Sequence, residues 1–210
     1  MIFTPGRVGL ATAGGALAGA LWWRAHPSAC PYGQRFWVEP PPPHPFITRS
    51  RLREVLTPAA GERILEVGPG TGYYSLPTAE SLGPAGRLDI YDLQQEMLDH
   101  TMRRAGERGR DNVFPVQGDA RQLPYADASF DGAYLTPVLG EIPDQDAALR
   151  EPRRALKPGG RLVVGELFGD PHYVRFRKLR KRGEAAGLHF ERRVGSALGF
   201  IARLSRPPHA

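Results

Sequence analysis

The feature that most constrains this chain is a glycine-rich turn directly after a short apolar run. Residues 64–72 read Ile-Leu-Glu-Val-Gly-Pro-Gly-Thr-Gly. Glycine permits the positive φ of a tight turn, and a side chain at Gly68 or Gly70 would stand between the backbone and a bound nucleoside. A dinucleotide-binding turn would place its third glycine one residue later than Gly72, and here Glu66 precedes the first. The turn therefore predicts a nucleoside site, with an ordinary glycine-rich connection as the alternative.

From Arg63 onward, apolar strands alternate with helical stretches, which predicts an α/β fold with a parallel sheet covered on both faces. The strands are expected at residues 63–67, 87–91, 113–117, 130–135, 161–166, 189–194 and 198–204. The connection between the last two is so short that they must pair antiparallel. Before the first strand, Thr48 is expected to cap a helix at residues 49–56.

The second expected strand ends at Asp92, where a carboxylate can accept hydrogen bonds from both hydroxyls of a ribose. The alternative is that Asp92 only caps the helix that begins near Gln94.

Two further motifs follow. Residues 117–131 read Gln-Gly-Asp-Ala-Arg-Gln-Leu-Pro-Tyr-Ala-Asp-Ala-Ser-Phe-Asp, and residues 154–162 read Arg-Ala-Leu-Lys-Pro-Gly-Gly-Arg-Leu. With the first glycine motif, they make the chain resemble the class I S-adenosylmethionine-dependent methyltransferases over about residues 48 to 204. The ubiquinone/menaquinone C-methyltransferase-like group, also called methyltransferase type 11, is the most similar.

The resemblance implies a Rossmann-like sheet of seven strands, mostly parallel with an antiparallel last strand, and S-adenosylmethionine as the cofactor. In the family, the aspartate at the position of Asp119 binds the adenine amino group, and the next residue, here Ala120, supplies a backbone donor. The helix at residues 49–56 would be a lid, and Gly159 and Gly160 would end the helix before the fifth strand. The implied cofactor-binding residues are Glu66, Gly68, Gly70, Gly72, Asp92, Leu93, Asp119 and Ala120.

The acceptor side is less defined. Glu141 stands where many relatives carry histidine, and it could be a buried partner, a substrate contact or an exposed helix residue. Glu141, Tyr134 and His172 are the candidates for a general base. No metal site is expected, because the six histidines are scattered and there is one cysteine, Cys30, which we interpret as incidental. The family's long insertion after the fifth strand is missing.

The expected function is methyl transfer to a small, apolar or membrane-associated acceptor. The Asn-Pro-Pro-Tyr motif of amide and adenine N-methyltransferases is absent. An RNA or protein methyltransferase remains an alternative, as does a protein that holds the cofactor without turnover. The oligomeric state is left open.

The N-terminal region is expected to be an appendage. Residues 8–23 carry no charge and end in Trp22 and Trp23. This is slightly shorter than the roughly 20 residues of a typical span, and a membrane anchor is favoured over a cleaved signal or an apolar helix packed on the domain. We therefore expect residues 1–25 as an apolar N-terminal helix, 26–47 as a proline-rich linker and 48–206 as the domain. The domain would be cytoplasmic, where S-adenosylmethionine is supplied.

The formal net charge is +6, and several of the basic residues form one cluster. It consists of Arg175, Arg177, Lys178, Arg180, Lys181 and Arg182. A helix with a solvated basic face is the favoured interpretation, and contact with anionic lipid or an acidic substrate is the alternative. No recognised motif favours nucleic acid as a partner.

Overall fold

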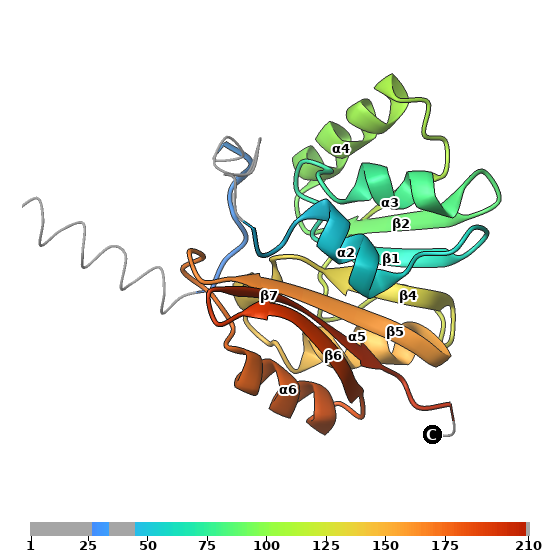
Figure 1. Ribbon diagram of the computed structural model, residues 1–210. Coiled ribbons are helices and arrows are strands. Elements are labelled where there is room, and N and C mark those ends of the chain that lie inside the picture. The colour runs from blue at the N-terminus through green and yellow to red at the C-terminus, as the bar shows by residue number, and fades with distance from the viewer. Residues whose placement is uncertain (1–26, 34–44, 209–210) are drawn as a thin grey trace, which may run out of the picture.

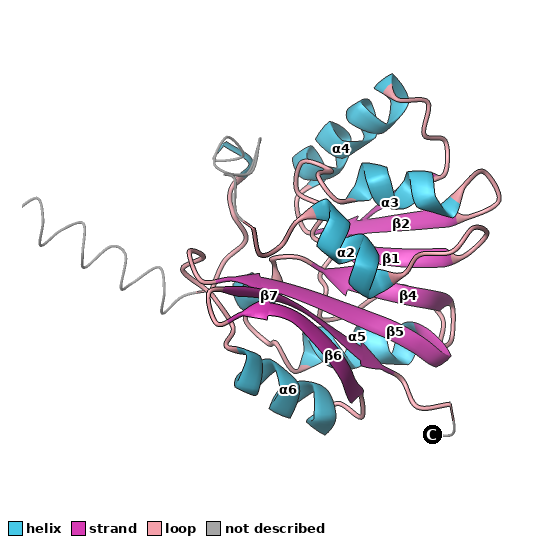
Figure 2. Ribbon diagram, in the orientation of Figure 1, coloured by secondary structure: helices cyan, strands magenta, loops and turns pink. Residues whose placement is uncertain are grey.

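The computed structural model describes residues 27–33 and 45–208, which form one sheet with helices on both faces (Figure 1; Figure 2). The strand order is β3-β2-β1-β4-β5-β7-β6. The strands are β1 (Arg63–Val67), β2 (Arg87–Asp92), β3 (Val113–Gln117), β4 (Phe130–Leu135), β5 (Leu156–Leu167), β6 (His189–Ser196) and β7 (Gly199–Ser205). Strands β1 to β5 pair parallel, and β7 pairs antiparallel with both β5 and β6. The predicted fold class of the sheet is confirmed.

Two hydrophobic cores lie on opposite faces of the sheet. Helices α2 (Arg49–Leu56), α3 (Ser75–Leu82) and α4 (Gln95–Glu107) contribute to one core, and α5 (Ala147–Ala155) and α6 (Phe176–Ala185) contribute to the other. Successive residues of β1 pack in different cores. Ile64 lies in the core with α2, α3 and α4, and Leu65 lies in the core with α5 and α6. A strand that is buried on both faces carries apolar side chains at successive positions, so the sequence of β1 does not alternate between apolar and polar residues.

Helix α2 has the predicted bounds. The Thr48 side chain accepts a hydrogen bond from the backbone N–H of Arg51, so it caps the helix as expected. Leu52, Val55 and Leu56 are buried, and the helix packs on β5, β6 and β7. The cap and the apolar stripe together explain why so short a helix is stable in this position.

The start of β5 differs from the prediction. Helix α5 ends at Ala155 because Leu156 already has extended backbone angles. Gly159 and Gly160, expected to end the helix, lie instead inside β5. Gly159 has a φ of +78° and its N–H donates to the carbonyl of Arg206 at 2.9 Å, so the turn is fixed by the C-terminal strand.

The basic residues of α6 are divided between two environments. Leu179 and Gly183 face the core, while Arg177, Lys178, Arg180 and Lys181 are exposed. Arg182 is half-buried and pairs with Asp146. The helix and its exposed basic face are as predicted, with Arg182 as the exception. That this face is solvated rather than in contact with anionic lipid stays a prediction.

The expected apolar helix and anchor at residues 8–23 lie outside the described residues, as does much of the expected linker. Within residues 27–33 and 45–208, no helix is both long enough and apolar enough to cross a membrane.

Candidate active site

A cavity of about 740 Å³ opens at the carboxyl ends of β1, β2 and β4. The strand order reverses between β1 and β4, and open α/β sheets bind ligands at such a switch point. Most of the predicted cofactor-binding residues line this cavity, namely Gly68, Gly70, Asp92, Leu93, Asp119 and Ala120. Glu66 and Gly72 do not line it.

The three glycines of the turn have different reasons to lack a side chain. All have positive φ, at +72° for Gly68, +56° for Gly70 and +79° for Gly72. A Cβ on Gly70 would meet nothing within 4 Å, so a ligand can approach the backbone there. A Cβ on Gly68 would lie 2.7 Å from Val138 Cγ2, and one on Gly72 would lie 3.0 Å from Thr101 Cγ2. The expected ligand contact therefore fits Gly70, whereas Gly68 and Gly72 are required by packing.

Glu66 is a buried carboxylate beside the turn. Its side chain is on β1, only 2 % of the residue is exposed, and Oε2 has no hydrogen-bond partner among the described residues. Burial raises the pKa of Glu66 to about 7. A carboxylate with an unsatisfied buried oxygen can receive a cation or a hydrogen-bond donor from a ligand.

Asp92 lines the cavity from the end of β2. Its Oδ1 accepts a hydrogen bond from the backbone N–H of Gln94 at 2.9 Å. This is a local turn around Leu93, and helix α4 begins only at Gln95 with no side-chain cap. Burial raises the pKa of Asp92 to about 6, so near neutral pH the carboxylate is largely ionised and able to accept hydrogen bonds.

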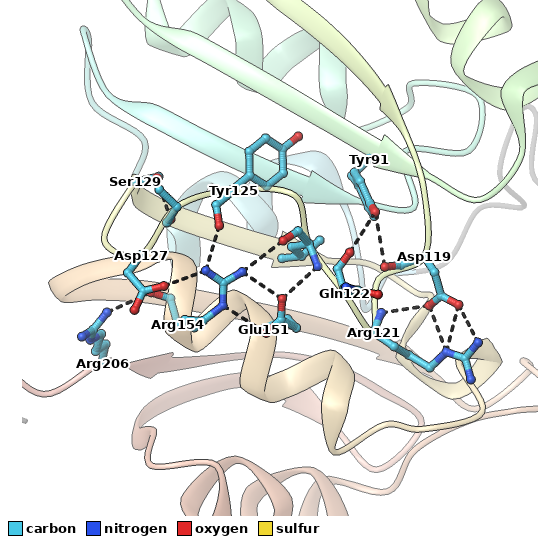
Figure 3. Close-up of polar contacts among 12 residues, drawn as sticks. Tyr91, Asp119, Arg121, Gln122, Tyr125, Asp127, Ser129, Glu151, Arg154 and Arg206 are labelled. Carbon is cyan, nitrogen blue, oxygen red and sulfur yellow. Dashed lines mark hydrogen bonds and ion pairs between the residues drawn. The ribbon is translucent and has the colours of Figure 1, made fainter.

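Asp119 is held by an ion pair that the sequence analysis missed. Both of its carboxylate oxygens accept from the guanidinium of Arg121, with Nε at 3.0 and 2.9 Å (Figure 3). The hydrogen bonds from Arg121 lower the pKa of Asp119. Tyr91 supports the same loop, because its hydroxyl lies 3.3 Å from the carbonyl oxygens of Asp119 and Gln122. Gly118 is needed here, since a Cβ would overlap the Tyr91 hydroxyl.

Arg154 fastens the rest of that loop to α5 (Figure 3). Its guanidinium donates to the carbonyls of Leu123 and Tyr125 at 3.1 and 2.8 Å and to the carboxylate of Asp127 at 2.7 Å. It also pairs with Glu151, whose other contact is the N–H of Leu123 at 2.8 Å. A planar guanidinium can satisfy several acceptors in one plane, so Arg154 positions the loop behind Asp119. The sequence contained Arg154 in a matching motif but gave no sign of these partners.

The three candidate bases occupy different environments. Glu141, at the end of the short helix η2 (Leu139–Glu141), and His172, before α6, both line the cavity. Tyr134 is fully buried in β4 and donates its hydroxyl hydrogen to Thr78 on α3 at 3.3 Å. Tyr134 is therefore in the wrong place for a base, because its ring faces a helix instead of the cavity. Burial, helped by the negative charge of Asp170, raises the pKa of Glu141 to about 8.

A strap of seven residues, 27–33, lies over the cavity. The side-chain amide of Gln94 accepts from the N–H of Tyr32 at 3.0 Å and donates to the carbonyl of Cys30 at 2.9 Å. The N–H of Cys30 donates to Glu141 Oε2 at 3.1 Å. Cys30 therefore lines the cavity and is not incidental, because its backbone hydrogen-bonds to Gln94 on one side and to Glu141 on the other. In contrast, no residue of α2 lines the cavity, so the expected lid role of that helix is wrong.

The buried acids predict an unusual dependence of stability on pH. Glu141 has a pKa of about 8 when folded, against 4.5 for a free side chain, so the folded protein binds more protons between these values. Its contribution to the free energy of unfolding is therefore lost as pH rises from about 4.5 to 8. Urea unfolding of the ligand-free chain at several pH values should show this decline, and Glu141→Gln should make it shallower. The exposed Glu96→Gln is the control, and equal slopes for wild type and Glu141→Gln would contradict the assignment.

The comparisons with known proteins agree with this geometry. Residues 45–178 match the sequence model of the ubiE/COQ5 methyltransferase family. The ubiquinone/menaquinone biosynthesis C-methyltransferase UbiE of Hahella chejuensis is 37 % identical over 113 residues, which are 53 % of this chain and 45 % of that protein. The demethylmenaquinone methyltransferase of Geobacillus kaustophilus is 36 % identical over 119 residues, which are 57 % of this chain and 50 % of that protein. The chain spans about half the length of the curated relatives it matches.

Among solved structures, a SAM dependent methyltransferase from Aquifex aeolicus has a TM-score of 0.77 at 18 % identity. The match covers 85 % of this chain and 100 % of that one, and it shows that the fold is shared. Since the family model covers more than half of the sequence, the chain belongs to the ubiE/COQ5 methyltransferase family, and its predicted class of S-adenosylmethionine-dependent methyltransferase is confirmed.

Proposed function

We propose that this chain methylates a small apolar acceptor that carries an acidic ring hydroxyl, of the quinol class. The observation that carries the proposal is one cavity, about 740 Å³, lined both by the turn at Gly70 and by Glu141 and His172. Cavities of this size hold ligands of ordinary small-molecule dimensions. The names of the two relatives, which refer to ubiquinone and menaquinone, support an acceptor of this class.

The residues present fit S-adenosylmethionine. The backbone at Gly70 is open to a ligand, and Asp92 offers a carboxylate to a ribose, whereas Glu66 lies buried behind the turn. Asp119 and Ala120 would hydrogen-bond to the adenine. The carboxylate of Asp119 would at the same time accept from Arg121. When bound, S-adenosylmethionine supplies an electrophilic methyl group. The work of the chain is to align the acceptor and to exclude water.

Glu141 is the favoured general base. A ring carbon becomes strongly nucleophilic when a neighbouring hydroxyl loses its proton, and a base works best with a pKa near the working pH. Glu141, with its pKa of about 8, meets this condition and faces the cavity. His172 lines the same cavity and is held through its backbone N–H, which donates to Asp170 at 2.7 Å. It is the second candidate.

Turnover with a defined acceptor tests this proposal. The purified chain should transfer labelled methyl from S-adenosylmethionine to a short-tailed demethylmenaquinol in detergent. Glu141→Gln should lower kcat by about 10²-fold or more with a smaller effect on cofactor affinity, because a general base contributes roughly 10²–10⁴. Glu96→Gln on the surface of α4 is the matched control.

Other outcomes would replace the proposal. Label in RNA or protein fractions instead of the quinol would support the alternative macromolecular acceptors. Cofactor binding without transfer to any acceptor would support a non-catalytic role. An unchanged kcat for Glu141→Gln would show that Glu141 is not the general base and would assign that role to His172.

The strap at residues 27–33 should retain the cofactor. Gln94→Ala removes both hydrogen bonds between the side chain and the strap, each worth about 1 kcal/mol. Dissociation of S-adenosylhomocysteine, followed by stopped-flow fluorescence, should therefore accelerate by up to about thirtyfold. Gln95→Ala is a matched control, because Gln95 is exposed and its side chain bonds to Asp99 in its own helix. Equal dissociation rates would show that the strap does not close the site.

We further propose that residues 8–23 tether the domain to a membrane, with the catalytic side in the cytoplasm. The support is the charge-free segment and its flanks, with Arg24 and Arg35 on the domain side against Arg7 on the other. Full-length protein should remain in the membrane pellet after carbonate extraction, and Leu17→Lys should release it. Release of the wild type by carbonate would exclude the tether.

A further inference from the structure

Two exposed apolar side chains lie together beside the mouth of the cavity. Phe168 is 62 % exposed at the end of β5, and Leu198 is 54 % exposed in the turn between β6 and β7. The N–H of Phe168 donates to the carbonyl of Leu198 at 3.1 Å, so the two segments are joined. Single exposed apolar residues are ordinary, but these two lie on adjacent segments, so a partner could contact both at once.

This pair is held in place by Tyr173. The Tyr173 ring meets Phe168 edge to face with centroids 5.8 Å apart, and its hydroxyl donates to the carbonyl of Ala197 at 2.8 Å. Tyr173 also contacts the buried ring of Phe200. The exposed pair is therefore presented by a packed support, and it can enter an apolar phase without rearrangement of the fold.

Unneutralised positive charge lies on α6 and β6, the elements between Phe168 and Leu198 in the chain. Arg193 lies with its guanidinium 4.5 Å from the centre of the Phe176 ring, and Arg175 directly precedes α6. The residues concerned are Arg175, Arg177, Lys178, Lys181 and Arg193, which are exposed and make no ion pair within the described residues. In contrast, Arg180, Arg182 and Arg192 pair with Glu184, Asp146 and Glu54.

The position of these residues connects them to the site. Leu167, Gly169 and Asp170 line the cavity on either side of Phe168. Figure 1 shows the end of β5, the β6–β7 turn and the start of α6 at the same end of the sheet. A surface that contacts Phe168 would therefore also face the cavity mouth.

We propose that the docking patch, defined as Phe168, Leu198, Arg175, Arg193 and the exposed basic residues of α6, binds an anionic lipid bilayer. The basic residues contact lipid headgroups, while Phe168 and Leu198 enter the boundary with the acyl chains. The aliphatic Leu198 favours lipid over nucleic acid, because bases stack on aromatic rings and gain little from an aliphatic side chain. Docking stands independently of the acceptor, and only the delivery of an apolar acceptor from the bilayer rests on the proposed function.

Vesicle binding tests the docking patch. The full chain carries Leu17→Lys so that residues 8–23 do not insert, and it is titrated with vesicles of phosphatidylcholine alone or with 30 mol % phosphatidylserine. Binding should require phosphatidylserine. Arg175→Gln/Arg193→Gln should weaken it about tenfold or more, since each basic residue near such a surface contributes about 1 kcal/mol. Phe168→Ser/Leu198→Ser should weaken it to a similar extent.

Matched controls lie on the opposite edge of the sheet. Arg103→Gln/Arg108→Gln removes two exposed charges, one from α4 and one directly after it, and Phe114→Ser removes an exposed ring from β3. These variants should bind vesicles as the parent does. Equal loss in the control variants, or none in the patch variants, would overturn the proposal. Loss of RNA binding by Arg175→Gln/Arg193→Gln with unchanged vesicle binding would also overturn it and assign the patch to nucleic acid.

Delivery is measured separately with the same variants. Phe168→Ser/Leu198→Ser should methylate a quinol in detergent at the parent rate and a quinol in anionic vesicles at least about tenfold more slowly. If the parent methylates neither, the proposed function fails while the vesicle titrations still decide the docking patch. If both rates fall equally, the patch does not deliver the acceptor.

Discussion

A carboxylate in a low-dielectric interior needs a cationic partner or a proton, and this constraint separates the two ends of the sheet. Toward the amino ends of the strands, buried Asp89 receives both Arg63 and Arg87. Burial alone would raise the pKa of Asp89, but these two guanidiniums lower it. At the carboxyl ends, Glu66, Glu141 and Glu166 have no arginine partner in residues 27–33 and 45–208, and burial raises their pKa values to about 7 or 8. Of these three acids Glu141 lines the cavity, and an acid with a raised pKa in a cavity is typical of functional sites.

The same constraint explains how the cavity is assembled. Without cationic side chains beside them, the acids at the carboxyl ends are satisfied by backbone N–H groups, such as Cys30 to Glu141 and Val174 to Glu166. A ligand with positive charge in the cavity would favour the ionised form of Glu141, which lines it. Binding and folding are therefore linked, since a ligand that favours the ionised carboxylates adds stability where rising pH removes it.

Local patterns predicted the elements of the fold, but not the contacts between them. The strands and α2 follow from apolar runs, Thr48 and the glycine turn. Asp92 follows from its position at the end of a strand, whereas Asp119 was implied by the family resemblance. The strap could not be predicted, because Cys30 reaches Glu141 across 111 positions. Tyr134 was wrongly proposed as a base for a similar reason. Its hydroxyl donates a hydrogen bond to Thr78 on α3, which is far away in the sequence. Arg121 could have been suspected from its closeness to Asp119, although an exposed Asp-x-Arg pattern has no fixed meaning.

The connection between β5 and α6 is short. Only Phe168 to Arg175 separate β5 from α6, so the chain has no insertion there to roof the acceptor end of the cavity. The strap covers one side through Gln94 and Glu141. On the other side the connection itself forms the rim, with His172 inside and Phe168 outside. An apolar acceptor entering past Phe168 would leave a lipid phase without crossing water, and the bilayer would take the place of the missing roof.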